Sequence, residues 1–191
     1  MSSLEATAVV LDAFEALRIP YMLVGAFSSN AYGIARSTKD ADFVVQLEEG
    51  DLTQLMGRLG SDFRLDRQLQ MEMITGSVKN VITFQPTKFD IELFRLSDDE
   101  HHQERFRRRQ RHPVSELNRE AWIPTAEDVV IQKLRWQRRK DLDDAINVLA
   151  VSAKMLDWEY LERWTAIHGT RGLLHQLRDE LPDLDLLDED D

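Results

Sequence analysis

The sequence predicts an α+β fold, in which a small mixed β-sheet flanked by helices is followed by a helical bundle. Up to residue 123, several short segments alternate apolar and polar residues, which is the period of a half-buried strand. From residue 125 onward the spacing of apolar residues becomes helical. Strands followed by a run of helices are typical of the α+β class.

The first half is predicted to contain both helices and strands. In chain order these are helix 4–17, strand 21–24, helix 27–33, strand 41–47, helix 51–59, strand 63–65, helix 67–74, strands 80–84 and 89–96, helix 98–110 and a short strand at 122–123. Asp51 is the expected N-cap of its helix, with Gly60 just past the end. The short link 85–87 predicts a hairpin between the strands on either side of it.

Four helices are expected in the second half. Thr125 and Asp128 form a capping box at the start of the first. Asp141, Asp157 and Thr170 are the expected caps of the other three. The chain is therefore predicted to divide into a first domain over 1–122, a helical extension over 123–181 packed on it, and an acidic, disordered tail over 182–191.

The composition excludes several classes of protein. With no cysteine, the chain can form neither a disulfide nor a thiolate metal site. It contains no apolar run of 18 residues, and its N-terminus lacks the basic and apolar regions of a secretory signal. We therefore expect a cytoplasmic protein without a membrane partner.

The net charge of −11 is concentrated at the C-terminal end. Residues 179–191 hold eight acids and no base, which leaves a net charge of −3 for residues 1–178. The acidic end is interpreted as a solvated tail or as a segment that binds a partner. The nearly neutral remainder argues against a large nucleic-acid footprint, since such binding depends on many basic contacts.

Two basic clusters, at 105–112 and 133–140, interrupt this acidic background. Each is either a solvated helix face or a patch that attracts phosphate groups. The neighbouring His101 and His102 are not expected to bind a metal together, because adjacent residues on a helix do not face each other.

The acids Asp40 and Asp42 are the most informative residues of the chain. They lie at the start of a predicted strand, where residues two apart point to the same face. Two adjacent carboxylates repel each other unless a cation or a shared proton lies between them. A divalent metal with oxygen ligands is the usual partner of such a pair.

A second strand carries the acids Asp90 and Glu92 on its polar face. If it pairs with the strand of Asp40 and Asp42, Asp90 becomes the expected third ligand, with Glu92 as its competitor. Three carboxylates can hold two metal ions roughly 3.5–4 Å apart, which stabilises the attacking and leaving oxygens of a phosphoryl displacement.

A turn of small residues precedes these acids. The apolar strand 21–24 ends at Gly25 and Ala26, and a short helix follows. Small residues allow a phosphate to approach the backbone, and the N–H groups at the start of a helix favour an anion. The order of the segments is therefore a phosphate turn, a helix, paired acids and a later acid.

These segments resemble the polymerase-β-type nucleotidyltransferase superfamily. Gly25-Ala26 and, after thirteen residues, Asp40-x-Asp42 are similar to its signature. The match is closer to a prokaryotic group that includes abortive-infection toxins, through Val24-Gly25-Ala26, Tyr32-Gly33, Arg36-x-Thr38, Glu127-Asp128, Lys133-Leu134 and the D-x-x-D of Asp141 to Asp144. The resemblance spans about residues 20–150.

The resemblance implies a transferase that moves a nucleoside monophosphate from a nucleoside triphosphate to an acceptor hydroxyl and releases pyrophosphate. Asp40, Asp42 and Asp90 are the implied catalytic residues and ligands of two Mg²⁺ ions, with Mn²⁺ as the alternative metal. Gly25, Ala26, Ser29, Arg36, Thr38 and Lys133 are the implied nucleotide-binding residues, and similar toxins use an acid at the position of Asp141. The acceptor is a tRNA, a protein or a small molecule, and an antitoxin is the implied partner protein.

Two of these residues, Ala26 and Lys133, keep a second interpretation. Ala26 stands where the family has Gly or Ser and cannot donate a hydrogen bond, so Ser28 or Ser29 is the alternative donor. Lys133 either binds the triphosphate or packs its stem while its amine reaches water. The alternative function is a catalytically degenerate nucleotidyltransferase fold that serves as a nucleotide- or partner-binding module.

Overall fold

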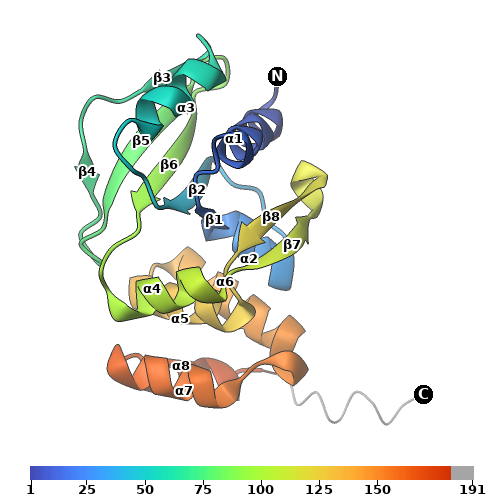
Figure 1. Cartoon of the computed structure of the whole chain (residues 1–191). Coiled ribbons are helices and arrows are strands. Elements are labelled where there is room, and N and C mark those ends of the chain that lie inside the picture. The colour runs from blue at the N-terminus through green and yellow to red at the C-terminus, as the bar shows by residue number, and fades with distance from the viewer. Residues whose placement is uncertain (182–191) are drawn as a thin grey trace.

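A mixed sheet of six strands forms the centre of the first half, in the computed structural model of the chain (Figure 1). The structure describes residues 1–181, so the tail predicted over 182–191 lies outside the described residues. The strands are β1 (Tyr21–Val24), β2 (Asp40–Val45), β3 (Phe63–Leu65), β4 (Gln70–Met71), β5 (Val78–Phe84) and β6 (Phe89–Arg95), in the order β1-β2-β6-β5-β3 with β4 beside β5. Only the β2–β6 pair among them is parallel. The predicted mixed sheet and the α+β class are confirmed.

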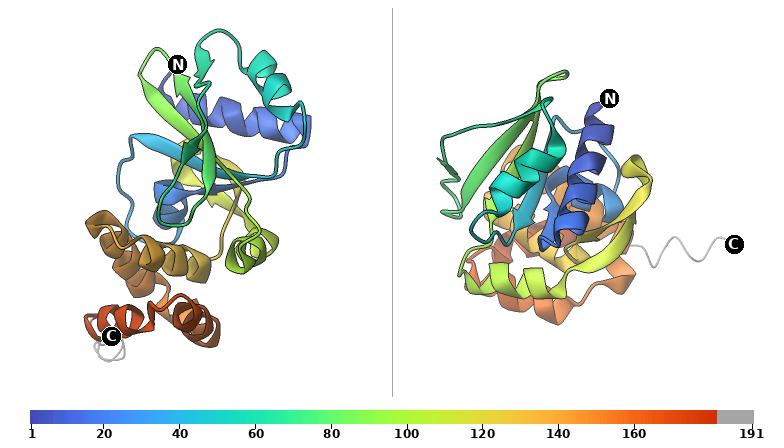
Figure 2. Two further views of the ribbon diagram at one scale, coloured as in Figure 1. Left: turned by 90° about the vertical axis from the view of Figure 1, so that its left-hand side faces the viewer. Right: turned by 45° about the horizontal axis from the view of Figure 1, so that its top comes forward.

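Helices α1 (Ser3–Leu17) and α3 (Asp51–Leu59) cover one face of this sheet (Figures 1 and 2). Their apolar sides meet the strands in the main core, where Phe14 of α1 and Leu55 of α3 are fully buried with Phe43. The Ser2 side chain begins α1 in a capping box with Glu5. The buried apolar side of α1 is thus the side that packs on the sheet.

The opposite face of the sheet carries both apolar and acidic side chains. Met22, Val44 and Phe94 form a small apolar cluster there with Phe106 and Trp136. Phe106 comes from α4 (Glu100–Arg108) and Trp136 from α5 (Ala126–Trp136), so these helices lie against this part of the sheet. The helix α2 (Gly25–Tyr32) follows β1 directly.

The structure corrects the region around residue 110. The helix expected over 98–110 ends at Arg108, and the next residues form β7 (Gln110–Val114), which the sequence did not predict. It pairs with β8 (Arg119–Ile123), after a turn of 3₁₀ helix at Ser115–Leu117. Strand β7 lacks a polar–apolar alternation and contains Pro113, so only its pairing with β8 makes it a strand.

The helix predicted over 67–74 is also wrong. This segment is irregular apart from β4, which pairs with β5. Its apolar side chains alternate with polar ones instead of forming a helical stripe, and Met73 is 85% exposed. The Glu72 carboxylate accepts hydrogen bonds from the backbone N–H groups of Ile74 and Thr75, which closes a turn. The hairpin predicted between β5 and β6 is present.

Four helices build the second half, as predicted: α5, α6 (Arg139–Ser152), α7 (Trp158–Ile167) and α8 (Arg171–Asp179), with a 3₁₀ turn at Ala153–Met155. They enclose a second core around Trp164, below the sheet in Figure 1. Thr125 and Asp157 cap α5 and α7 as expected. The capping box predicted at Thr125 is incomplete, because Asp128 accepts from the Thr125 hydroxyl and not from its backbone N–H. Thr170 stands at the N-cap of α8 without a capping hydrogen bond.

The prediction that Asp141 is the N-cap of its helix is wrong. Residue 138 is the N-cap of α6, and Asp141 lies in the first turn, where its carboxylate contacts basic side chains. The division of the chain at residues 122 and 123 stays a prediction, although Tyr32 packs against the cores on both sides. Within residues 1–181, no helix combines the length and the apolar character that crossing a membrane requires.

Candidate functional site

The four acids of β2 and β6 lie on one face of the sheet. The parallel register sets Asp40 opposite Asp90 and Asp42 opposite Glu92. Residues directly opposite each other in neighbouring strands point to the same face, and so do residues two apart in one strand. The alternation read from the sequence therefore places these acids side by side.

A polar pocket with a cavity volume of about 150 Å³ lies over three of these acids. Asp40, Asp42 and Glu92 line it, whereas Asp90 does not. Asp90 instead accepts a hydrogen bond of 2.7 Å from the Thr83 hydroxyl. Because the register aligns Glu92 with Asp42, the third acid of this pocket is Glu92, the residue that the sequence left as the competitor of Asp90.

The charge of Asp42 is the least compensated of the group. Burial, followed by the neighbouring Asp40 and Glu92, raises the pKa of Asp42 to about 7, against the effects of Lys133 and Lys79. Among the described residues, none donates a hydrogen bond to Asp42, whereas Thr38 donates to Asp40 at 2.7 Å. Glu92 accepts from Lys79 Nζ at 2.6 Å. A cation beside Asp42 would remove this imbalance.

The donor set fits a cation that is shared with a ligand. In residues 1–181, no group of three or more acidic or histidine side chains is arranged to hold a metal ion. Asp40 and Asp42 therefore offer two carboxylates instead of a complete protein cage. Mg²⁺ is usually bound in this way, through one or two carboxylates together with the phosphates of a substrate.

The turn at Gly25 lies against these acids. Gly25 has a φ of +65°, and a β-carbon there would come within 2.1 Å of Asp42 Oδ2. Helix α2 begins at this residue, so its first N–H groups are next to the carboxylates. The hydroxyls of Ser28 and Ser29 both donate to the Gly25 carbonyl oxygen at 3.0 Å, and Ala26 is buried.

Arg36, Lys133 and Asp141 come together around a residue that the sequence did not single out, Asp144. Arg36 donates two hydrogen bonds to the Asp144 carboxylate, at 2.7 and 2.8 Å. Lys133 Nζ donates to Asp144 at 2.6 Å and to Asp141 at 3.3 Å. The amine of Lys133 is therefore paired inside the protein and does not reach water, since the side chain is only 6% exposed.

The two acids of this cluster come from one face of α6. Burial acts to raise the pKa of Asp144, but the hydrogen bonds from Arg36 and Lys133 outweigh it and hold that pKa below its usual value. Asp141 is fully buried and also accepts from Arg138 Nε at 2.6 Å. The D-x-x-D spacing was the available signal for Asp144, because residues three apart on a helix are neighbours.

The Glu127-Asp128 pair has a structural position. Asp128 is fully buried and accepts hydrogen bonds from His101 at 3.1 Å and from the Tyr160 hydroxyl at 2.8 Å. Glu127 accepts from the backbone N–H of Asp157, at the start of α7. This pair thus joins α4, α5 and α7, and the site beside it depends on that arrangement.

Comparisons with known proteins identify the family. A family model described as "Nucleotidyltransferase of unknown function (DUF6036)" matches residues 14–173. A search of curated proteins finds no match to this sequence.

Solved structures of nucleotidyltransferases have the same fold. The solution structure of the antibiotic-resistance factor ANT(2'')-Ia has 14% identity and a TM-score of 0.61, and the match covers 94% of this chain and 99% of that one. A crystal structure of ANT(2")-Ia in complex with adenylyl-2"-tobramycin has 13% identity and a TM-score of 0.59, covering 90% and 99%. An antigenic nucleotidyltransferase-like protein from Paracoccidioides brasiliensis has 18% identity and a TM-score of 0.55, covering 90% of both chains.

At these identities the structural similarity shows the fold alone. The family model confirms the predicted resemblance to nucleotidyltransferases, and the shared fold agrees with the polymerase-β-type superfamily. The family model extends over both halves of the chain, from α1 into α8. The chain therefore belongs to this family of nucleotidyltransferases of unknown function.

Proposed function

We propose that the protein transfers a nucleoside monophosphate from a nucleoside triphosphate to an acceptor hydroxyl. The observation that carries this proposal is the position of Asp42. Its carboxylate lies beside Asp40, has a raised pKa and touches the turn at Gly25 from which α2 starts. An anion bound at that helix start and a cation held by the two acids would compensate each other.

Asp40 and Asp42 would hold Mg²⁺ or Mn²⁺ together with the phosphates of the nucleotide. Such a cation stabilises the charge of the attacking and leaving oxygens in a phosphoryl displacement. The backbone N–H groups after Gly25 would bind the phosphates. Ala26 does not remove these contacts, because they come from the main chain.

The acids of the pocket also provide a group that accepts a proton. The bond between the acceptor oxygen and the α-phosphorus forms while the bond from that phosphorus to the pyrophosphate oxygen breaks, and the electron pair leaves with pyrophosphate. Glu92, instead of the Asp90 expected from the sequence, is our candidate for the carboxylate that takes the hydroxyl proton. Glu92 lines the pocket beside Asp42, whereas Asp90 faces Thr83.

Lys133 and Arg36 would support the nucleotide through their charge. Lys133 acts on Asp42 electrostatically, so its amine is close enough to favour a phosphate in the same place. Asp144 holds both basic side chains in fixed positions. A fixed donor loses less conformational entropy on binding than a mobile one.

The candidate acceptors are a tRNA, a protein and a small molecule. The near-neutral charge of residues 1–178 favours an acceptor smaller than a nucleic acid. The complex of ANT(2")-Ia with adenylyl-2"-tobramycin shows that this fold accommodates a nucleotidylated small molecule. A defence or toxin–antitoxin context, with an antitoxin as partner, remains part of the proposal drawn from the resemblance.

A binding module without catalysis is the second candidate. It is favoured by internal ion pairs of the site, such as Lys79 with Glu92 and Lys133 with Asp144, which compensate charges that a catalytic site would offer to its substrates. Ala26 also removes a side-chain donor from the phosphate turn.

Incubation of the protein with each nucleoside triphosphate labelled at the α-phosphate, in cell extract with Mg²⁺, tests the proposal. Label on RNA, protein or a small molecule that is absent with Asp42→Asn supports transfer and identifies the acceptor class. Nucleotide binding without any label transfer would favour the module. Label transfer that Asp42→Asn leaves unchanged would contradict the proposed site.

A further inference from the structure

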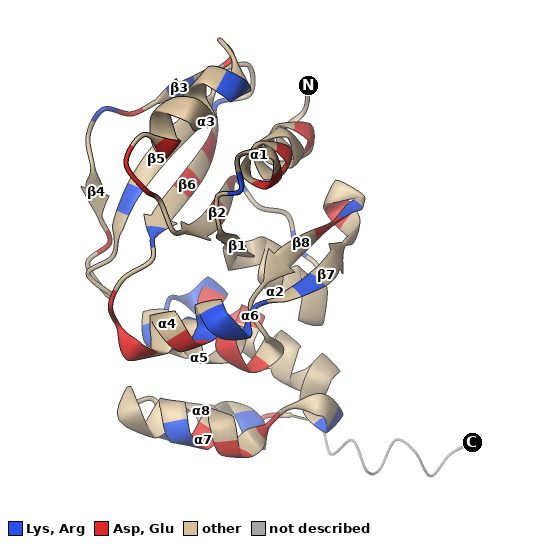
Figure 3. Cartoon of the chain, viewed as in Figure 1, with Lys and Arg blue, Asp and Glu red and all other residues tan. Residues whose placement is uncertain are grey.

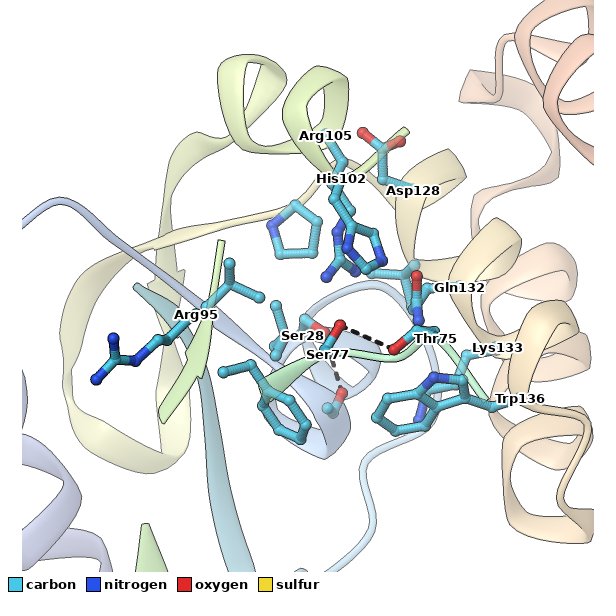
Figure 4. A pocket seen from close by; sticks show the side chains of 16 residues that line it. Ser28, Thr75, Ser77, Arg95, His102, Arg105, Asp128, Gln132, Lys133 and Trp136 are labelled. Atoms are coloured by element: carbon cyan, nitrogen blue, oxygen red, sulfur yellow. Dashed lines mark hydrogen bonds between the residues drawn. The ribbon is translucent and has the colours of Figure 1, made fainter. Parts of the chain in front are cut away.

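A second pocket, with a cavity volume of about 40 Å³, lies next to the pocket of the acids. Phe94 and Trp136 line both of them and stand between the two spaces. The second pocket is bounded by the sheet, α4 and α5, and Gly25, Ser28 and Lys133 also reach it (Figure 4). It therefore lies on the side of Asp42 where the phosphate turn begins.

Arg105 of α4 is a buried cation in this pocket. Its side chain is 6% exposed, and its Nε has no hydrogen-bond partner within residues 1–181. It forms no ion pair with any described residue either. The acids around it are already engaged, since Asp128 accepts from His101 and Tyr160, and Asp99 pairs with Arg135.

Burial lowers the pKa of Arg105 to about 10, so the side chain is still charged at neutral pH. Asp128, which lines the same pocket, and Asp99 act on Arg105 electrostatically but form no ion pair with it. A buried charge without a direct partner is unfavourable unless a ligand or another group compensates it. Arg105 is thus the group in this pocket with the greatest need of an anionic ligand.

Two further buried nitrogen atoms belong to residues that line the same space. His102 Nε2 and Trp136 Nε1 are buried and have no partner among the described residues. His102 Nδ1 is 2.6 Å from the Ser97 hydroxyl, and burial, followed by Arg105, lowers the pKa of His102 to about 3. A neutral ring that accepts from Ser97 carries its N–H at Nε2.

Figure 4 shows Arg105 and His102 reaching down from α4 toward Ser28 and Ser77. The remaining wall is mostly apolar, which strengthens the attraction between a guanidinium and an anion because water does not screen it. The ligand that fits these groups is rich in acceptor oxygens, carries negative charge and extends from the Gly25 turn.

We propose that Arg105 binds the terminal phosphates of the nucleoside triphosphate, and that this pocket holds the pyrophosphate portion when the nucleoside monophosphate is transferred. This inference rests on the proposed function for the identity of the ligand. Arg105 offers the planar pair of donors that matches phosphate oxygens. The sequence placed this residue only in a basic cluster, and its burial distinguishes it from the other arginines of α4.

Titration calorimetry with inorganic pyrophosphate, a nucleoside triphosphate and a nucleoside monophosphate tests the proposal. Arg105→Gln should weaken pyrophosphate and triphosphate binding about tenfold or more, because it removes a charge-assisted bidentate contact, and should change monophosphate binding less than about twofold. Orthophosphate is titrated as a further ligand. An affinity for orthophosphate equal to that for pyrophosphate would contradict a site for two linked phosphates.

Arg95→Gln is the matched control. Arg95 also borders this pocket, but its guanidinium hydrogen-bonds to Asn80 and points away from the pocket in Figure 4. Arg95→Gln removes one positive charge, as Arg105→Gln does, but leaves the buried guanidinium of Arg105 in place. The affinities for pyrophosphate, the triphosphate and the monophosphate should therefore stay within about twofold of wild type. Equal loss in both variants would overturn the assignment, since it would show a general effect of charge.

A structural role of Arg105 is separated from binding by NMR on the wild-type protein. Pyrophosphate should shift the side-chain Nε–H resonance of Arg105, which Arg105→Lys assigns by its disappearance. An unshifted resonance at saturating pyrophosphate would overturn the inference. If pyrophosphate binds through Arg105 but no label is ever transferred, the phosphate pocket stands and the proposed function fails. If label is transferred but Arg105→Gln leaves pyrophosphate binding unchanged, the proposed function stands and the assignment of this pocket is refuted.

Discussion

Gly25 is in direct contact with Asp42, so that a β-carbon on residue 25 would lie 2.1 Å from Asp42 Oδ2. The φ of +65° at Gly25 is also one that side chains rarely adopt. The turn that begins α2 and the central acid of the site therefore fit only while residue 25 has no side chain.

Gly25→Ala should destabilise the protein by about 1–3 kcal/mol, because the new methyl group strains the backbone and displaces the Asp42 carboxylate. Urea unfolding measures this loss. The control is Gly57→Ala in α3, where a β-carbon meets nothing within 4 Å and should be neutral or stabilise by about 0.5–1 kcal/mol. Equal stability of the two variants would show that the contact is not as close as described.

The titration of Asp42 should lower the free energy of unfolding as the pH rises. Its folded pKa of about 7 lies above the unfolded value of about 3.9, so between these values the folded state binds the extra proton and loses stability with increasing pH. In the absence of nucleotide and metal, Asp42→Asn should be more stable than wild type at pH 8, by about 1–4 kcal/mol, and nearly equal to it at pH 4.

Thermal unfolding between pH 4 and pH 8 measures this effect. The exposed Asp62 supplies the control, since Asp62→Asn should change stability little over the same range. A wild-type protein that is more stable than Asp42→Asn at pH 8 would contradict the uncompensated charge.

Asp144→Asn should destabilise the protein by about 2–4 kcal/mol at pH 7, because Lys133 would lose its closest carboxylate and remain buried. The folded pKa of Asp144 is lowered, so its contribution is present above the unfolded pKa and is lost as the pH falls below it. The gap between wild type and variant should therefore close in acid.

Chemical unfolding at several pH values tests this, with Asp143→Asn on the exposed side of α6 as the matched control. Similar small effects of the two substitutions would mean that the cluster around Asp144 adds little to stability.

Glu92→Gln should reduce nucleotide transfer about 100-fold or more, because it removes the acid that faces Asp42. Asp90→Asn should reduce it less than about tenfold, since its carboxylate hydrogen-bonds to Thr83 outside the pocket. The labelled-nucleotide assay in extract compares the two. The reverse order of effects would restore Asp90 as the third acid.

The features that depend on local pattern could be predicted from the sequence. The alternation around Asp40 and Asp42 predicted their shared face, and the helical spacing after residue 125 predicted four helices. Strand β7 and the irregular segment around β4 could not be predicted, because each depends on pairing with a strand that the local sequence does not specify.

The partners of the charged residues could not be predicted from the sequence either. The sequence could not decide between Asp90 and Glu92, since both lie on one face and only the register with β2 separates them. Arg36 and Asp144 are 108 residues apart, so their ion pair follows from how α6 packs and not from a local pattern. The sequence showed Arg105 only as one arginine of a basic cluster, because its burial depends on the tertiary structure.

Calorimetric titration of a nucleoside triphosphate into the protein, with Mg²⁺ or with a chelator, tests the central claim most directly. If Asp40 and Asp42 hold a cation jointly with the phosphates, the wild type binds the nucleotide with Mg²⁺, and binding falls at least about tenfold with the chelator and in Asp42→Asn. Binding that is equally tight without Mg²⁺ or in Asp42→Asn would contradict the account, as would no binding of any nucleoside triphosphate in the presence of Mg²⁺.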